Sequence, residues 1–191
     1  MPPKRRPAPT SLARRRGALY NVLFPIWLLF IWPPVIPLVV VFNTAFDALV
    51  LVLALKRLGI EKDARWALLK ARLWKVVVAG FAADLAGAAF MLLALLVDSS
   101  FSQLGIPHAW LYEQVVAPVM FNPFQAFPGF LWTLAAVAFA GLLIYVLNRN
   151  WCLKGCGLSD GQVHRTALAL AVFTAPYVFL VPSQLMWTTT Y

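Results

Sequence analysis

The feature that most constrains the fold is a long apolar segment, WKVVVAGFAADLAGAAFMLLALLV, at residues 74–97. Its only charged residues are Lys75 and Asp84. As a helix, the segment would extend about 36 Å at a rise of about 1.5 Å per residue, and the hydrocarbon core of a bilayer is about 30 Å thick. The segment is therefore predicted to be a transmembrane helix.

The composition of the whole chain extends this prediction to the entire fold. Soluble domains contain about 45–50% apolar and about 25% charged residues. This chain of 191 residues is 62% hydrophobic and only 12% charged. A soluble fold could not bury so much apolar surface, so lipid must cover it. We expect an all-α integral membrane protein, a polytopic helical bundle in contact with the lipid bilayer.

Four segments are long and apolar enough for full spans, and a fifth is short and ends at a proline pair. The full spans are expected at 35–56, 74–97, 129–148 and 165–187. Residues 18–32 precede Pro33 and Pro34, which break helices. They are predicted either to cross as a short fifth span or to re-enter the side they came from. Residues 18–191 should form one domain, preceded by a disordered basic arm at 1–17.

The positive charges predict the orientation of the spans. All sixteen Lys and Arg residues lie in three patches beside apolar segments, at 4–16, 56–75 and 149–165. Such patches are typical of the cytoplasmic side, so we expect a cytoplasmic N-terminus and cytoplasmic loops at 57–73 and 149–164. The outward loop, 98–127, has no Lys or Arg, and the C-terminus should also lie outside, in a multi-pass protein of the cell membrane. The net charge of +9 thus reflects topology, and no nucleic-acid partner is expected.

Two of the predicted spans carry an acid near their centre. Asp47 lies near the middle of 35–56, and Asp84 lies near the middle of 74–97. An acid at the centre of a transmembrane helix costs about 2.5–3.5 kcal/mol on insertion scales. Because these two helices run antiparallel, both acids are expected near the bilayer midplane.

Other polar residues are predicted at the same depth. Asn43 lies one helical turn from Asp47, on the same face. In the last span, Thr174 and Tyr177 flank Pro176, which should free a backbone carbonyl one turn earlier. The two acids, Asn43, Thr174 and Tyr177 are therefore predicted to form one polar cluster.

No Lys, Arg or His is expected at this depth, so two ionised carboxylates would lack a counter-charge within the chain. There are three resolutions. The acids are neutral and hold helices together by hydrogen bonds. A proton, a cation or a small solute occupies the site. Alternatively, a protein partner or a second copy of this chain supplies the positive charge.

Small residues surround Asp84 at helical spacing. Ala79, Ala83 and Gly87 recur every four residues, and Gly80 lies one turn before the acid. Small residues at this spacing let another helix approach closely. We therefore expect Asp84 to face protein rather than lipid, with these four residues in helix packing.

Signals for a metal site or for catalysis are weak. Cys152, Cys156 and His164 are three candidate metal ligands without a fourth, so two reduced thiols are expected instead of a metal site. The chain has no HExxH, GxSxG or glycine-rich phosphate motif. No cofactor and no enzymatic activity are expected.

The sequence supports three functional hypotheses. The first is a small carrier or channel-like protein that binds or conducts a proton, a cation or a small solute at Asp47 and Asp84. The second is a non-catalytic accessory or assembly subunit of a larger membrane complex, with the buried polar residues as helix-packing contacts. The third is an intramembrane enzyme acting on lipid, for which no catalytic set is visible.

Overall fold

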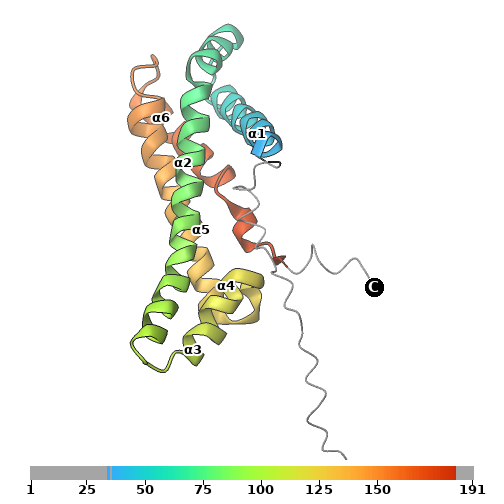
Figure 1. The fold of residues 1–191 in the computed structure, drawn as a ribbon. Coiled ribbons are helices and arrows are strands. Elements are labelled where there is room, and N and C mark those ends of the chain that lie inside the picture. The colour runs from blue at the N-terminus through green and yellow to red at the C-terminus, as the bar shows by residue number, and fades with distance from the viewer. Residues whose placement is uncertain (1–33, 35, 184–191) are drawn as a thin grey trace, which may run out of the picture.

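The computed structural model describes residue 34 and residues 36–183. These residues form helices joined by short turns, and no strand occurs among them. The bundle is elongated, with the long helix α2 running along most of its length (Figure 1). The basic arm predicted at 1–17 and the short span predicted at 18–32 lie outside the described residues.

The four principal helices are α1 (Ile36–Arg57), α2 (Lys62–Gln103), α5 (Phe127–Leu147) and α6 (Asp160–Phe173). Together with the short helical turns that continue α5 and α6, they give four segments long and apolar enough to cross a membrane. The prediction of a helical membrane bundle is confirmed.

Helices α1 and α2 form an antiparallel hairpin with a short turn. Gly59 occupies this turn with a φ of 76°, a left-handed conformation that glycine adopts without strain. Helix α2 then begins at Lys62 and continues to Gln103 without a break. The charged loop predicted at 57–73 is therefore mostly the first part of α2, which extends beyond the apolar segment at both ends.

The predicted outward loop, 98–127, is largely helical. After α2 ends, the chain forms α3 (Ala109–Leu111), a π-helical turn η3 (Tyr112–Val116), α4 (Ala117–Phe121) and a 3-10 turn η4 (Pro123–Gln125). These short elements pack against α5 at one end of the bundle (Figure 1). Residues 109–121 of this predicted loop are thus one unbroken series of helical turns.

The chain returns along α5, which continues into a π-helical turn, η5 (Asn148–Cys152). Helix α6 begins at a capping box, in which the Ser159 side chain accepts from the Gln162 backbone N–H and the Gln162 side chain accepts from the Ser159 backbone N–H. This reciprocal pair satisfies two backbone donors at the start of the helix.

The last span differs from the continuous helix predicted at 165–187. Helix α6 ends at Phe173, and the chain resumes as a short 3-10 helix, η6 (Tyr177–Leu180). Pro176 accounts for the break, because it has no N–H for the helix and disfavours helical geometry at Ala175. Residues 184–187 of the predicted span lie outside the described residues.

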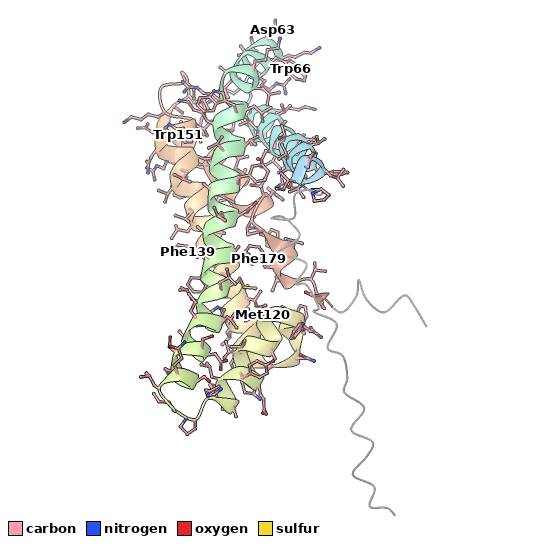
Figure 2. The ribbon with its side chains drawn as sticks, viewed as in Figure 1. Asp63, Trp66, Met120, Phe139, Trp151 and Phe179 are labelled. Carbon is pink, nitrogen blue, oxygen red and sulfur yellow. The ribbon has the colours of Figure 1, made fainter. Side chains whose placement is uncertain are left out.

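Two clusters of buried apolar side chains hold the bundle together. The first joins α1, α2, η5 and α6, through residues such as Leu51, Leu55 and Leu170. The second joins α2, α5, the short outer helices and η6, through Met91, Val116 and Phe179. Phe179 lies beside α2, between the levels of Trp66 and Met120 (Figure 2).

Candidate functional site

A pocket opens between α1, α2 and the end of α6, with a volume of about 270 Å³. It lies where the first core cluster ends and the second begins along α2, since Ala83 belongs to one and Ala88 to the other. The segment after α6 lies on the same side of α2 as α1, so that these three elements surround the pocket (Figure 1).

The structure brings all five polar residues of the predicted cluster to this pocket. Two come from α1, one from α2, and two from the break after α6: Asn43, Asp47, Asp84, Thr174 and Tyr177. Their convergence follows from the antiparallel hairpin of α1 and α2 and from the packing of α6 against α1.

The two carboxyl groups are held in apolar surroundings. The Asp47 side chain is buried, with 6% of its surface exposed. Its Oδ2 atom lies against Gly80 of α2, where an added methyl group would be 3.4 Å away. Asp84 Oδ1 is buried and has no hydrogen-bond partner within the described part of the chain. A buried polar atom without a partner is costly, and such atoms in native structures call for an explanation.

Two hydroxyl groups beside the break after α6 donate to backbone carbonyls. Tyr177 donates its hydroxyl to the Val172 carbonyl oxygen at 2.6 Å, the acceptor that Pro176 leaves without a backbone donor. Thr174 lies within hydrogen-bonding reach of Asp47, and its hydroxyl donates to the Leu170 carbonyl oxygen at 2.8 Å. Each hydroxyl has one hydrogen, so in this state neither donates to an ionised carboxylate, while each oxygen can still accept from a protonated one.

The charges of the pocket all have one sign. No Lys, Arg or His is among its described lining residues, and Asp47 and Asp84 are the only ionisable acids. The C-terminal end of α6 adds partial negative charge, because helix carbonyls there point along the axis. The site is therefore suited to a proton or a cation and not to an anion.

Aromatic side chains form a wall of the pocket that sequence reasoning missed. Phe46 adjoins Asp47 on α1, Phe81 lies on α2, and Phe173 and Tyr177 flank the helix break. Helical spacing could have predicted one of these residues. Phe81 precedes Asp84 by three residues and so lies on the same face of the helix. The position of Phe173 depends on where α6 ends, which spacing alone does not indicate.

The four predicted small packing residues have two different environments. Ala79 and Ala83 are buried in the first core cluster, and Gly87 faces Phe179 and Ala140 of the same chain. Gly80 instead lines the pocket beside the Asp47 carboxyl group. Where this face of α2 is closely packed, it is therefore covered by other helices of the same chain.

The three weak metal-ligand candidates do not form a ligand set. Cys152 is buried, Cys156 donates its thiol to the Leu153 carbonyl oxygen, and both are free thiols. His164 instead pairs its Nδ1 with the Tyr145 hydroxyl at 2.8 Å. No cluster of three or more His, Cys, Asp or Glu side chains occurs among the described residues.

No protein-family model, curated protein or solved structure matches this chain.

Proposed function

We propose that this membrane protein binds an exchangeable proton or cation at Asp47 and Asp84, as a small carrier or channel-like protein. The observation that carries the proposal is the buried Asp84 Oδ1 atom without a described partner, in a pocket lined by no basic side chain. Ionisable groups inside a membrane are costly and commonly mark ion or proton pathways.

The shape of the site also favours a bound species over structural hydrogen bonding. If the acids only joined helices, each carboxyl group should be paired with a polar group on a neighbouring helix. The nearby hydroxyls of Thr174 and Tyr177 donate to backbone carbonyls, and Asp84 Oδ1 has no described partner. The pocket also leaves space of about 270 Å³ beside the acids, which structural contacts would have no reason to keep open.

The protonation state of the two acids tests the proposal. We would record infrared difference spectra of the purified protein in lipid between about pH 5 and pH 9, a range that burial of a carboxyl group makes accessible. Spectra would be taken with and without Na⁺ or K⁺. We expect a carboxyl band that changes with pH or cation and is lost in the Asp47→Asn and Asp84→Asn variants.

The matched control is Asp98→Asn, because Asp98 is a buried acid of the same helix α2 whose Oδ1 also lacks a described partner, yet it lies outside the pocket. This variant should retain the changing band. A neutral carboxyl band that responds neither to pH nor to cation would contradict the proposal. Such a result would favour the accessory-subunit hypothesis, which predicts stoichiometric co-purification with a partner.

A further inference from the structure

We propose that the cation bound by this pocket is an amphiphilic organic cation, an amine or quaternary ammonium with a hydrocarbon tail, and that it exchanges with a proton. This inference rests on the proposed function, because it names the substrate class of the same site. It is carried by the size of the pocket, by its aromatic wall and by an adjoining apolar groove.

The pocket is larger than a small inorganic ion needs. A single water requires roughly 10–15 Å³ on the same measure of volume, against about 270 Å³ here. A metal ion prefers a close shell of oxygen ligands. Most side chains around the pocket instead present carbon.

The aromatic wall suits an organic cation. Phe46, Phe81, Phe173 and Tyr177 line the pocket together with the two acids. An ammonium group is attracted to the face of an aromatic ring, most strongly where water is excluded. Rings and carboxylates together would hold a cation whose outer surface is hydrocarbon.

A second hollow shares two of these aromatic side chains. Phe46 and Phe173 also line a groove of about 250 Å³ between α1 and α6. The rest of this groove is apolar up to Arg57, and its remaining lining residues are Leu49, Val50, Leu53, Ala54 and Ala169. Phe46 and Arg57 are about 16 Å apart along α1 at a rise of about 1.5 Å per residue. The groove can thus accept a hydrocarbon tail.

Charge determines which way such a ligand would lie. The acids are at one end of the combined pocket and groove, and the Arg57 guanidinium is at the other. A positively charged head group is attracted to Asp47 and Asp84 and repelled by Arg57. The tail would therefore lie in the groove with the head group between the acids.

The exposure of two aromatic rings is consistent with a ligand that enters the pocket from the bilayer. Phe46 and Phe173 are 48% and 56% exposed on the outer surface of the bundle, which lipid covers. A ligand that partitions into the membrane can reach the pocket laterally through these two side chains. This favours an amphiphilic cation over a fully hydrated one.

The exchange balances in charge and protons. When both acids are protonated, the empty site is neutral. A monovalent cation binds as one carboxyl group releases its proton to water, which leaves one carboxylate paired with the cation and the other acid neutral. One bound cation therefore releases one proton.

The test uses octyltrimethylammonium with the full chain in lipid nanodiscs. We would measure binding by titration calorimetry against empty nanodiscs and follow the carboxyl infrared band and proton release in parallel. We expect saturable binding of one cation per chain, with a changed band and one proton released. The uncharged isostere, 2,2-dimethyldecane, should leave the band unchanged.

Tetramethylammonium, which has no tail, separates the pocket from the groove. It should bind at least about tenfold more weakly, since each buried methylene contributes roughly a factor of four. An Ala54→Trp substitution, which fills the groove, should abolish most of this difference. Equal affinity of the two cations for the unsubstituted protein would overturn the role of the groove.

Ring removal tests the aromatic wall. Phe46→Leu and Phe173→Leu keep apolar bulk and should each weaken octyltrimethylammonium binding by about 3- to 10-fold. The control is Phe42→Leu, because Phe42 is exposed one turn away on the same helix and lines neither the pocket nor the groove. Its affinity should be unchanged.

The outcomes separate this inference from the proposed function. A carboxyl band that responds to pH or Na⁺, with no response to octyltrimethylammonium, would overturn the organic-cation inference and leave the proposed function standing. A band that responds to nothing would overturn both. A band that changes equally with 2,2-dimethyldecane would show apolar filling alone and would also overturn the inference.

Discussion

Helix α2 presents glycine at two neighbouring levels, and the surroundings of these glycines differ. At Gly87 the bundle is closed, because an added methyl group would lie 2.8 Å from Phe179 and 3.1 Å from Ala140. At Gly80 the bundle is open, and the same methyl group would meet only the Asp47 carboxyl group, at 3.4 Å. Small residues therefore serve close packing at one level and leave room for a pocket at the other.

The last span differs between the two levels. Phe179, on η6, fills the space next to Gly87, whereas Asp47 of α1 and the non-helical residues 174–176 line the pocket at the level of Gly80 and Asp84. The helix break thus lies at the open level.

The largest expected effect on stability comes from adding a methyl group at Gly87, where the bundle leaves no space for it. Gly87→Ala should lower the free energy of unfolding by about 1–3 kcal/mol, because the Phe179 ring must shift. Gly80→Ala is the matched control and should not destabilise the protein, since its contact distance is ordinary. Thermal or denaturant unfolding in detergent would measure both. Equal losses of stability in Gly87→Ala and Gly80→Ala would show that the two levels of α2 are equally closely packed.

The next effect concerns the buried acid at the hollow level. Asp84→Leu should raise the free energy of unfolding of the ligand-free protein by about 1–2 kcal/mol, because it removes a buried oxygen without a described partner. The pocket has room for the larger side chain. The same unfolding assay measures the change. A clear loss of stability would mean that the Asp84 carboxyl group is satisfied, and the comparison of the two levels would fail.

Restoring the helix should have a smaller energetic effect but a local structural one. Pro176→Ala supplies an N–H that can donate to the Val172 carbonyl, worth about 1 kcal/mol. We expect α6 to continue beyond Phe173 and amide hydrogen exchange over residues 174–180 to slow. Pro182→Ala is the control, because Pro182 lies after η6 and should leave this exchange unchanged. Unchanged exchange in Pro176→Ala would show that other contacts cause the break.

An effect of similar or smaller size is expected from a single hydroxyl. Tyr177→Phe removes the donor to the Val172 carbonyl, which Pro176 cannot replace, and should cost about 0.5–1.5 kcal/mol. Tyr145→Phe is a matched tyrosine change at the charged end of the bundle, where Arg149 and His164 bond the hydroxyl. Water can replace these bonds, so this variant should lose less. A larger loss of stability in Tyr145→Phe than in Tyr177→Phe would indicate that water reaches the helix break.

Several elements of the fold could be predicted from local sequence. The bounds of α1 and α5 lie close to the predicted spans 35–56 and 129–148, because hydropathy over one helix length is a local property. The gathering of Asn43, Asp47 and Asp84 also followed from one hairpin and from helical spacing. These inferences needed only the chain direction and the helical repeat.

Other elements could not be predicted in this way. Pro176 indicated a weakened helix, but not that α6 would end at Phe173 and that Tyr177 would cap the Val172 carbonyl. Gly80 and Gly87 both follow an alanine in the same apolar segment, and only the residues of other elements that face them distinguish their packing.

The sequence by itself determined that this chain is a helical membrane protein and that its acids lie within apolar helices. Composition and hydropathy suffice for that, because lipid cannot satisfy an exposed backbone. The tertiary structure alone decided that an aromatic-lined pocket opens beside these acids and that an apolar groove adjoins it. The rotation and ending of each helix determine which side chains meet, and both depend on contacts between residues far apart in the chain.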